Sequence, residues 1–240
     1  MTDFKIKNED LLGKKISNIE KEWDIYWEKS PSKKLVRKLY DTIASFYRKY
    51  LIGPTFKEHI KKNLLNNCEL LHAGCGGGEV DSFIIDDYNI TAVDISSNAL
   101  ELYKKINKDK AIMIKSNIFN MDFNGKKFDG IYNLGVVEHF VEKEFIAFLE
   151  HIKMHLSSDG KIILFWPPSY GLSVIALHLI HFFINIFLKR KIKLHSDEPF
   201  KFTSLKKVKK TIKPIGLEIV DKSFSYKDAF TYVVLVLKRI

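Results

Sequence analysis

Apolar positions between residues 66 and 166 form short runs that alternate with stretches of helical spacing. The continuous runs near 68–73, 89–94, 111–115, 128–133 and 160–166 predict buried strands. Apolar residues recurring every three or four positions predict helices near 79–86, 97–106 and 142–156. Strands that alternate with helices are typical of an α/β fold with a doubly wound, mainly parallel sheet.

Both ends of the chain depart from this alternation. Ser30-Pro31 predicts the start of a helix that Gly53-Pro54 ends, and a second helix is expected near 56–65. After a predicted helix near 204–212, GLEIVDKSFSY and FTYVVLVLKR predict two strands that form an antiparallel hairpin. We therefore expect an N-terminal helical cap over 1–65 and a second domain over 66–240, with an insert at 169–200.

The insert contains LSVIALHLIHFFINIFL, 17 residues from Leu172 to Leu188 without a charged side chain, followed by KRKIK. As a helix this stretch would be about 25 Å long, which is short for a bilayer span. An apolar helix beside a basic run fits contact with an anionic membrane surface. It fits a lid or a homodimer contact through 172–193 equally well.

Charge and cysteine content limit the class of protein. The net charge is +10, with Lys and Arg in excess over 1–66 and 189–213 and acidic residues in excess between them. That distribution suggests an anionic partner, or else it reflects genome composition, which can favour lysine codons. Cys68 and Cys75 argue against a disulfide framework, lie in no metal-binding pattern and give no reason to expect a metal site. The polar N-terminus MTDFKIKNED lacks the apolar core of a signal peptide, so a cytoplasmic protein is expected, at the inner membrane surface if the insert contacts lipid.

The stretch LLHAGCGGGEV carries four glycines in five residues directly after an apolar run. A glycine loop between a strand and a helix lets a ligand approach bare backbone, although a tight turn without a ligand would also use it. The spacing is G-x-G-x-G over Gly74, Gly76 and Gly78, and Glu79 stands where the dinucleotide fingerprint requires glycine. Asp94, at the end of the next predicted strand, could accept ribose hydroxyls or cap a helix.

These motifs resemble those of the class I S-adenosylmethionine (SAM) dependent methyltransferases. LLHAGCGGG is similar to the first motif of that family, AVDIS to the second, and IKSNIFN to the end of the third strand. FDGIYNLGVVEHF and GKIILFWPP resemble the fourth and fifth strands with their loops. The resemblance covers residues 66–166 closely and 200–240 in topology, and it implies the family's Rossmann-like sheet, with SAM as cofactor.

The resemblance also implies a division of roles. The glycine loop would approach the cofactor, Asp94 would bind the ribose, and His139 is a candidate catalytic residue or a packing residue. The family usually has an acidic residue where this chain has His72, which leaves the role of His72 open. The other implied cofactor-binding positions flank the loop or follow the second, third and fourth strands: Ala73, Ile95, Asn117, Ile118, Asn133, Leu134 and Gly135.

Methyl transfer from a sulfonium is a direct displacement, which mainly requires alignment of the acceptor and exclusion of water. YNLG stands where amino-group methylases of bases or glutamine carry an Asn/Asp-Pro-Pro-aromatic motif, so we expect oxygen or carbon of a small-molecule or lipid-like acceptor. An RNA methyltransferase and a non-catalytic SAM-binding partner subunit are the alternatives. LYDTIASFY, with Tyr40, Asp41 and Tyr47, is loosely similar to a segment of quinone-type methyltransferases that covers the cofactor. An amphipathic helix packed on the sheet edge is the alternative for that segment.

Overall fold

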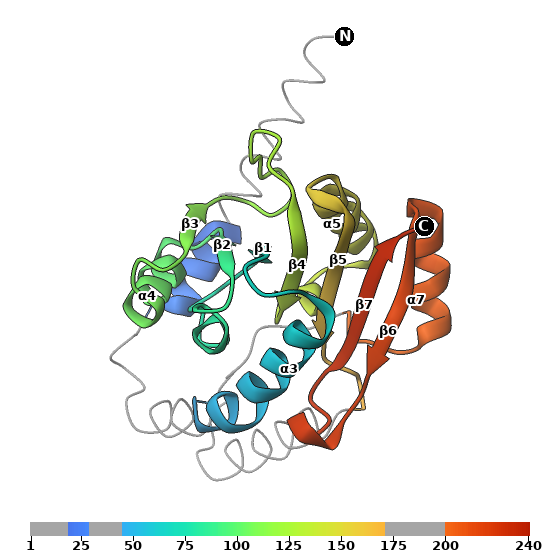
Figure 1. The fold of residues 1–240 in the computed structure, drawn as a ribbon, viewed down its shortest axis with the longest axis horizontal. Coiled ribbons are helices and arrows are strands. Elements are labelled where there is room, and N and C mark those ends of the chain that lie inside the picture. Colours follow the sequence, from blue (N-terminus) through green and yellow to red (C-terminus); the bar gives the residue numbers. More distant parts are fainter. Residues whose placement is uncertain (1–18, 29–44, 171–199) are drawn as a thin grey trace.

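A seven-stranded sheet runs through the computed structural model, which describes residues 19–28, 45–170 and 200–240 (Figure 1). The strand order is β3-β2-β1-β4-β5-β7-β6. The strands are β1 (Glu69–Ala73), β2 (Asn89–Asp94), β3 (Ile112–Lys115), β4 (Phe128–Leu134), β5 (Leu156–Trp166), β6 (Leu217–Ser223) and β7 (Val233–Arg239). The first five pair in parallel, and β7 is antiparallel to both β5 and β6. The predicted mainly parallel sheet with a C-terminal antiparallel hairpin is confirmed.

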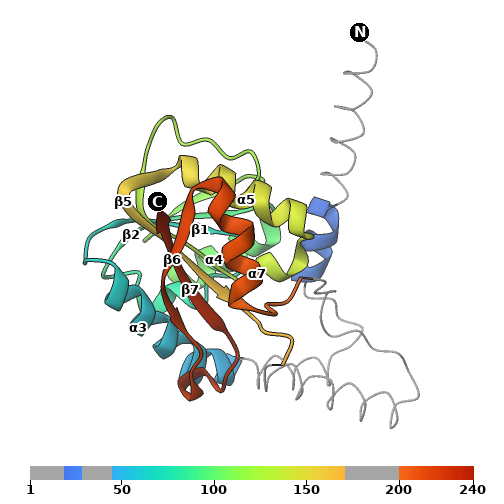
Figure 2. The same ribbon diagram turned by 90° about the vertical axis from the view of Figure 1, so that its right-hand side faces the viewer.

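Helices cover both faces of the sheet (Figures 1 and 2). α3 (Gly53–Asn63) and Tyr103 of α4 (Ser97–Asn107) pack with one apolar cluster. α5 (Glu142–Met154) and α7 (Leu205–Ile212) pack with the cluster on the other face. Because both faces are covered, the end of β5 from Ile162 to Trp166 is continuously buried and reads as an unbroken apolar run.

The helix predicted near 79–86 is wrong. That stretch holds only turns and the 3₁₀ segment η3 (Asp81–Phe83). Asp81 is fully buried and accepts bonds from side chains on β1, β4 and α4, which holds the backbone in a tight turn. Tertiary bonds to one carboxylate thus outweigh the local preference for a longer helix.

The prediction that Gly53-Pro54 ends a helix is also wrong. These residues begin α3, directly after the π-helical turn η2 (Arg48–Ile52), and proline is tolerated at a first helical turn. A Cβ atom on Gly53 would lie 2.2 Å from the ring of Phe83, so glycine serves close packing here. The helix predicted to start at Ser30-Pro31 lies outside the described residues, apart from helical positions from 45 onward.

Candidate cofactor and active site

The glycine loop follows β1 at the edge of the sheet where the parallel strands end. Gly74, Gly76 and Gly78 all have left-handed backbone, with φ of 79°, 51° and 67°. A Cβ on Gly74 would lie 2.5 Å from Val136, and one on Gly78 would lie 2.1 Å from Tyr103. The glycines at these positions are therefore required by backbone conformation and by close approach of neighbouring elements.

The backbone of this loop is tied to the end of β2. Gly74 and Cys75 both donate their N–H to the carbonyl of Val93, at 2.9 Å. The carboxylate of Asp94 accepts the N–H of Gly76 at 2.8 Å and the N–H of Ser96 at 2.9 Å. Burial raises the pKa of Asp94, and the two backbone donors act in the opposite direction. A carboxylate has about four lone-pair sites, so Asp94 keeps acceptor capacity for ribose hydroxyls.

His72 stands where the family usually has an acidic residue, and the carboxylate of Asp81 lies beside it. Its Nδ1 lies 2.9 Å from Oδ2 of Asp81, and Asp81 also accepts the hydroxyls of Tyr103 at 2.7 Å and Tyr132 at 2.8 Å. Burial and Asp81 raise the pKa of both phenols, so they remain donors. Sequence reasoning missed Asp81, Tyr103 and Tyr132, since nothing in their spacing distinguishes them from ordinary helix and strand residues.

The end of β4 is fixed beside the end of β1. Asn133 is buried and donates its amide Nδ2 to the carbonyl of Ala73 at 2.6 Å. Its Oδ1 is buried without a hydrogen-bond partner in the part of the chain that the structure describes. Gly135 has φ of 80°, and a Cβ there would have only Glu138 Oε1 nearby, at 4.0 Å. An ammonium group bound at this position could satisfy the free oxygen of Asn133.

The predicted adenine side lies next to Asp94. Ser116, directly after β3, donates its N–H to the carbonyl of Asp94 at 3.0 Å. Asn117 uses its side-chain oxygen to accept the N–H of Phe119 at 3.0 Å, which closes a local turn. Ile95, Asn117 and Ile118 are half-buried, so each exposes some surface to a ligand. Leu134, at the end of β4, is half-buried as well.

His139 ends the 3₁₀ segment η4 (Val137–His139), which follows β4. Its ring meets the indole of Trp23 edge to face, with centroids 5.3 Å apart. Trp23 comes from a helix formed by residues 19–27, here called the N-terminal helix. His139 therefore lies at the same edge as the glycine loop, which is where a group acting on the methyl acceptor would be needed.

Tyr47 contacts the β6–β7 connection, which lies beside the carboxyl end of β5. Its hydroxyl donates to the backbone oxygen of Asp228 at 3.1 Å and also bonds with the hydroxyl of Thr231, both in the β6–β7 connection. This contact fits the alternative of a helix packed on the sheet edge. Tyr40 and Asp41 lie outside the described residues.

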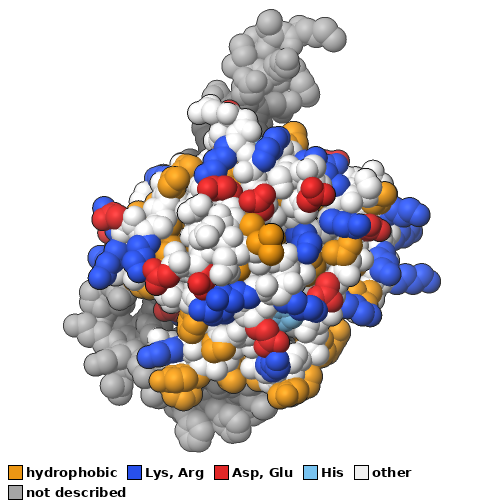
Figure 3. Space-filling model, viewed as in Figure 1, with side chains coloured by type: hydrophobic (Ala, Val, Ile, Leu, Met, Phe, Trp, Pro, Cys, Tyr) orange, Lys and Arg blue, Asp and Glu red, His pale blue; other side chains and the backbone are white. Residues whose placement is uncertain are grey.

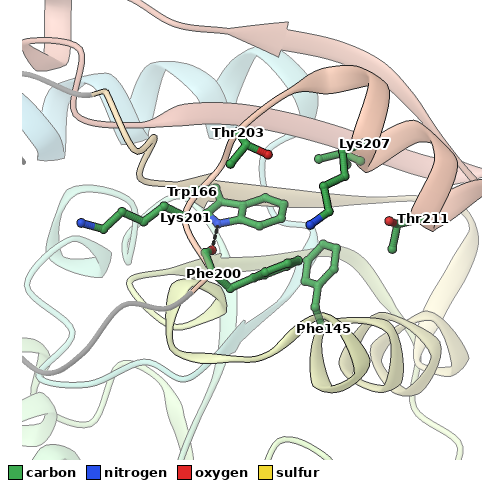
Figure 4. Close-up of a pocket in the computed structure, with 8 residues that line it drawn as sticks. Phe145, Trp166, Phe200, Lys201, Thr203, Lys207 and Thr211 are labelled. Atoms are coloured by element: carbon green, nitrogen blue, oxygen red, sulfur yellow. Dashed lines mark hydrogen bonds between the residues drawn. The ribbon is translucent and has the colours of Figure 1, made fainter.

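Not every hollow in the molecule is a ligand site. Figure 4 shows one between α5, β5 and the segment leading into α7, where the indole of Trp166 donates to the carbonyl of Phe200 at 2.6 Å. Its volume is about 10 Å³, which is room for one water molecule. Aromatic rings fill the rest of this seam, so it is part of the packing.

β1 lies between β2 and β4, so the order in which strands are added to the sheet reverses at β1, which the glycine loop follows. Ligands of doubly wound sheets bind at such a point, outside the carboxyl ends of the strands. Residues 71–164 match a family model described as a methyltransferase domain. This part of the chain is a class I SAM-dependent methyltransferase domain. The chain is accordingly an enzyme of the methyltransferase class, with SAM as its cofactor.

Solved structures share this methyltransferase fold, and 1035 of their chains match. Magnesium protoporphyrin IX methyltransferase from Synechocystis PCC 6803, with bound S-adenosylhomocysteine (SAH), is 14% identical, and the match covers 91% of this chain and 93% of that chain with a TM-score of 0.59. A SAM-dependent methyltransferase from Clostridium acetobutylicum ATCC 824 is 17% identical, with 84% and 99% covered and a TM-score of 0.57. The 1,6-didemethyltoxoflavin-N1-methyltransferase of Burkholderia thailandensis is 15% identical, with 85% and 81% covered and a TM-score of 0.57.

At these identities the likeness concerns the fold. No curated protein sequence matches the chain. The roles of the individual binding residues and of His139 stay predictions, although the structure brings the glycine loop, Asp94 and Asn133 together through direct hydrogen bonds.

Proposed function

We propose that the chain transfers the methyl group of SAM to oxygen or carbon of a small or lipid-like acceptor. The observation that carries this proposal is a cavity of about 320 Å³ at the carboxyl end of β5. This edge of the sheet also holds the glycine loop and Asp94. Pockets for small molecules start at about 300 Å³ and are mainly apolar with a few polar groups. The cavity is lined by Tyr170, Phe202, Thr203, Ser204, Leu205, Lys222, Ser223, Phe224 and Val233.

Aromatic rings dominate one wall of this cavity. The ring centroids of Tyr170 and Phe224 lie 5.7 Å apart, and those of Phe224 and Phe230 lie 5.1 Å apart with the rings tilted by 56°. Phe224 and Tyr170 are 41% and 52% exposed, so both offer free surface to a ligand. A flat or apolar acceptor could pack against these rings, and Lys222 could pair with an anionic substituent.

The chemistry asks little of the protein beyond positioning. The cofactor supplies an activated methyl group on a sulfonium, which leaves as a neutral thioether. The chain must hold the acceptor in line, exclude water and, for a hydroxyl acceptor, take up a proton. His139 is the candidate for that proton, since it lies at the carboxyl edge and carries an imidazole.

Solved methyltransferases of this fold that are named for small-molecule acceptors support the proposed acceptor class, among them those of magnesium protoporphyrin IX, 1,6-didemethyltoxoflavin and mitomycin. The RNA alternative would call for a continuous basic surface. On the face drawn in Figure 3, Lys and Arg are interspersed with Asp and Glu. Several lysines of the described residues form ion pairs, such as Lys110 with Asp86 at 2.6 Å and Lys62 with Asp221 at 2.6 Å.

Membrane or homodimer contact through 172–193 would suit a lipid-like acceptor, but that segment lies outside the described residues. Within the described ranges, no helix is both long and apolar enough to cross a bilayer.

Isotope-labelled SAM, incubated with the protein and three separate acceptor pools, tests the proposal. We expect label in a small-molecule or lipid extract and none in total RNA. Phe224→Ala should lower this transfer at least about tenfold, because an aromatic wall contributes a few kcal/mol, and it should leave SAH affinity unchanged. Tyr226→Ala is the matched control, since Tyr226 is 75% exposed in the same connection and does not line the cavity.

The two alternatives predict other results. Label found in RNA alone would contradict the proposed acceptor class. SAH binding without transfer to any pool would favour the non-catalytic partner subunit.

A further inference from the structure

The N-terminal helix lies across the edge that carries the predicted cofactor residues, and it can be followed as the blue segment in Figures 1 and 2. Ser96, two residues after Asp94, donates its hydroxyl to Oδ1 of Asp24 at 2.5 Å. Asn98 donates its amide to the carbonyl of Asp24 at 2.9 Å. Glu20 pairs with Lys115 at the end of β3 at 2.5 Å. The helix is thus bound to the ends of both β2 and β3.

The contact that indicates what this helix does is made by Trp27. A Cβ atom on Gly76 would lie 2.7 Å from Cζ2 of Trp27, and one on Gly77 would lie 3.4 Å from Cζ3. The indole ring therefore packs directly on the bare backbone of the glycine loop. This is the surface that the predicted cofactor site uses, since bare glycine backbone lets a nucleotide-type ligand approach closely.

We propose that the N-terminal helix competes with the cofactor for the glycine loop. Trp27 occupies the surface of the loop, and Asp24 holds the helix in this docked position. This inference rests on the proposed function, because it assumes that SAM binds at Gly76. The ring and the cofactor cannot both contact the same backbone, so the helix leaves the loop when the cofactor binds. Release of SAH lets the helix return.

Asp24 is suited to hold the helix in its docked position reversibly. Its carboxylate lies at the N-terminus of α4, where the helix dipole favours a negative charge. The hydroxyl of Ser96 lowers the pKa of Asp24, so the carboxyl is ionised in the docked state at neutral pH. Asp24 is half-buried, although its partner Ser96 is fully buried, so water can reach the carboxylate when the helix moves.

Competition of this kind makes a quantitative prediction. The measured dissociation constant equals the intrinsic value divided by the fraction of molecules whose loop is open. Variants that weaken docking raise that fraction and tighten binding. Trp27→Ala and Asp24→Asn should each bind SAH about three- to tenfold more tightly than the parent by calorimetry. Ile25→Ala is the matched control, because Ile25 is 67% exposed on the same helix, and it should bind as the parent does.

Fluorescence gives an independent readout of the ring itself. In a Trp23→Phe background the remaining indoles are Trp27 and the buried Trp166. We expect SAH to increase quenching of the emission by acrylamide, because Trp27 moves into solvent.

Each result has one meaning. Weaker SAH binding by Trp27→Ala would make Trp27 a wall of the bound cofactor and would overturn the competition. Equal binding by Trp27→Ala, Asp24→Asn and Ile25→Ala would overturn it as well, while SAM binding itself would stand. Absence of SAH binding in the parent and in all variants would instead refute the proposed function.

Discussion

Nδ1 of His72 lies 2.9 Å from Oδ2 of Asp81, and both side chains are buried. Methyltransferases of this family usually have an acidic residue at the end of β1, and this chain has a histidine there with a carboxylate beside it. Asp81 also accepts two phenol hydroxyls, from Tyr103 and Tyr132. One carboxylate thereby joins β1, β4 and α4 directly beneath the glycine loop.

Asp81→Ala should destabilise the protein strongly. The change leaves three buried donors without an acceptor, and each unsatisfied buried group costs about 1–3 kcal/mol. We expect the free energy of unfolding, measured by urea denaturation, to fall by about 3 kcal/mol or more. Asp86→Ala is the control, because the Asp86 side chain is 77% exposed and pairs with exposed Lys110, so its loss should cost under about 1 kcal/mol. Equal effects of the two substitutions would contradict the role of the Asp81 cluster.

Restoring the family residue by His72→Asp should also destabilise the protein. It would place two carboxylates in contact at a buried position, where like charges repel strongly. We expect a loss of about 2 kcal/mol or more in the free energy of unfolding. The double variant His72→Asp with Asp81→Asn should recover part of this loss, because one of the two charges is then removed. A single variant as stable as the parent would show that the carboxylate of Asp81 does not determine the residue at position 72.

Much of the fold follows from the sequence because strand burial and helix periodicity are local signals. The strand predicted at 89–94 and the helix predicted at 97–106 agree with β2 and α4 to within a residue. The glycine loop and Asp94 could be found because their residue types and spacing are set by backbone conformation and charge. The Asp81 cluster and the contact of Trp27 could not be found, since each depends on which distant segments meet. The helix predicted at 79–86 failed for the same reason.

Asp94→Ala should affect both cofactor affinity and stability. Loss of the predicted bonds to ribose, at roughly 1.5–3 kcal/mol each, should lower SAH affinity about tenfold to several hundredfold. The structure adds a second cost, because the N–H groups of Gly76 and Ser96 lose their acceptor. We therefore also expect the free energy of unfolding to fall by about 1–3 kcal/mol.

Calorimetry with SAH and urea denaturation measure these two effects separately. Asp109→Ala, at an 80% exposed side chain paired with Lys104, is the control and should change neither. Tight SAH binding by Asp94→Ala would refute the assignment of the ribose site.

Acid should destabilise the protein through two buried histidines. Burial lowers the pKa of His59, and burial together with neighbouring His151 lowers the pKa of His155. Below the ordinary histidine pKa of about 6.5, the unfolded chain binds protons that the native state does not, so the free energy of unfolding falls as the pH falls.

Urea denaturation at pH 7.5 and pH 5.5 should show this loss in the parent and a smaller loss in the double variant His59→Gln, His155→Gln. Asp94 and Asp228 act in the opposite sense, because burial raises the pKa of each, and they are present in both proteins. The difference between the two pH dependences therefore isolates the histidines. Identical losses in the parent and the double variant would show that neither His59 nor His155 is kept neutral by its burial.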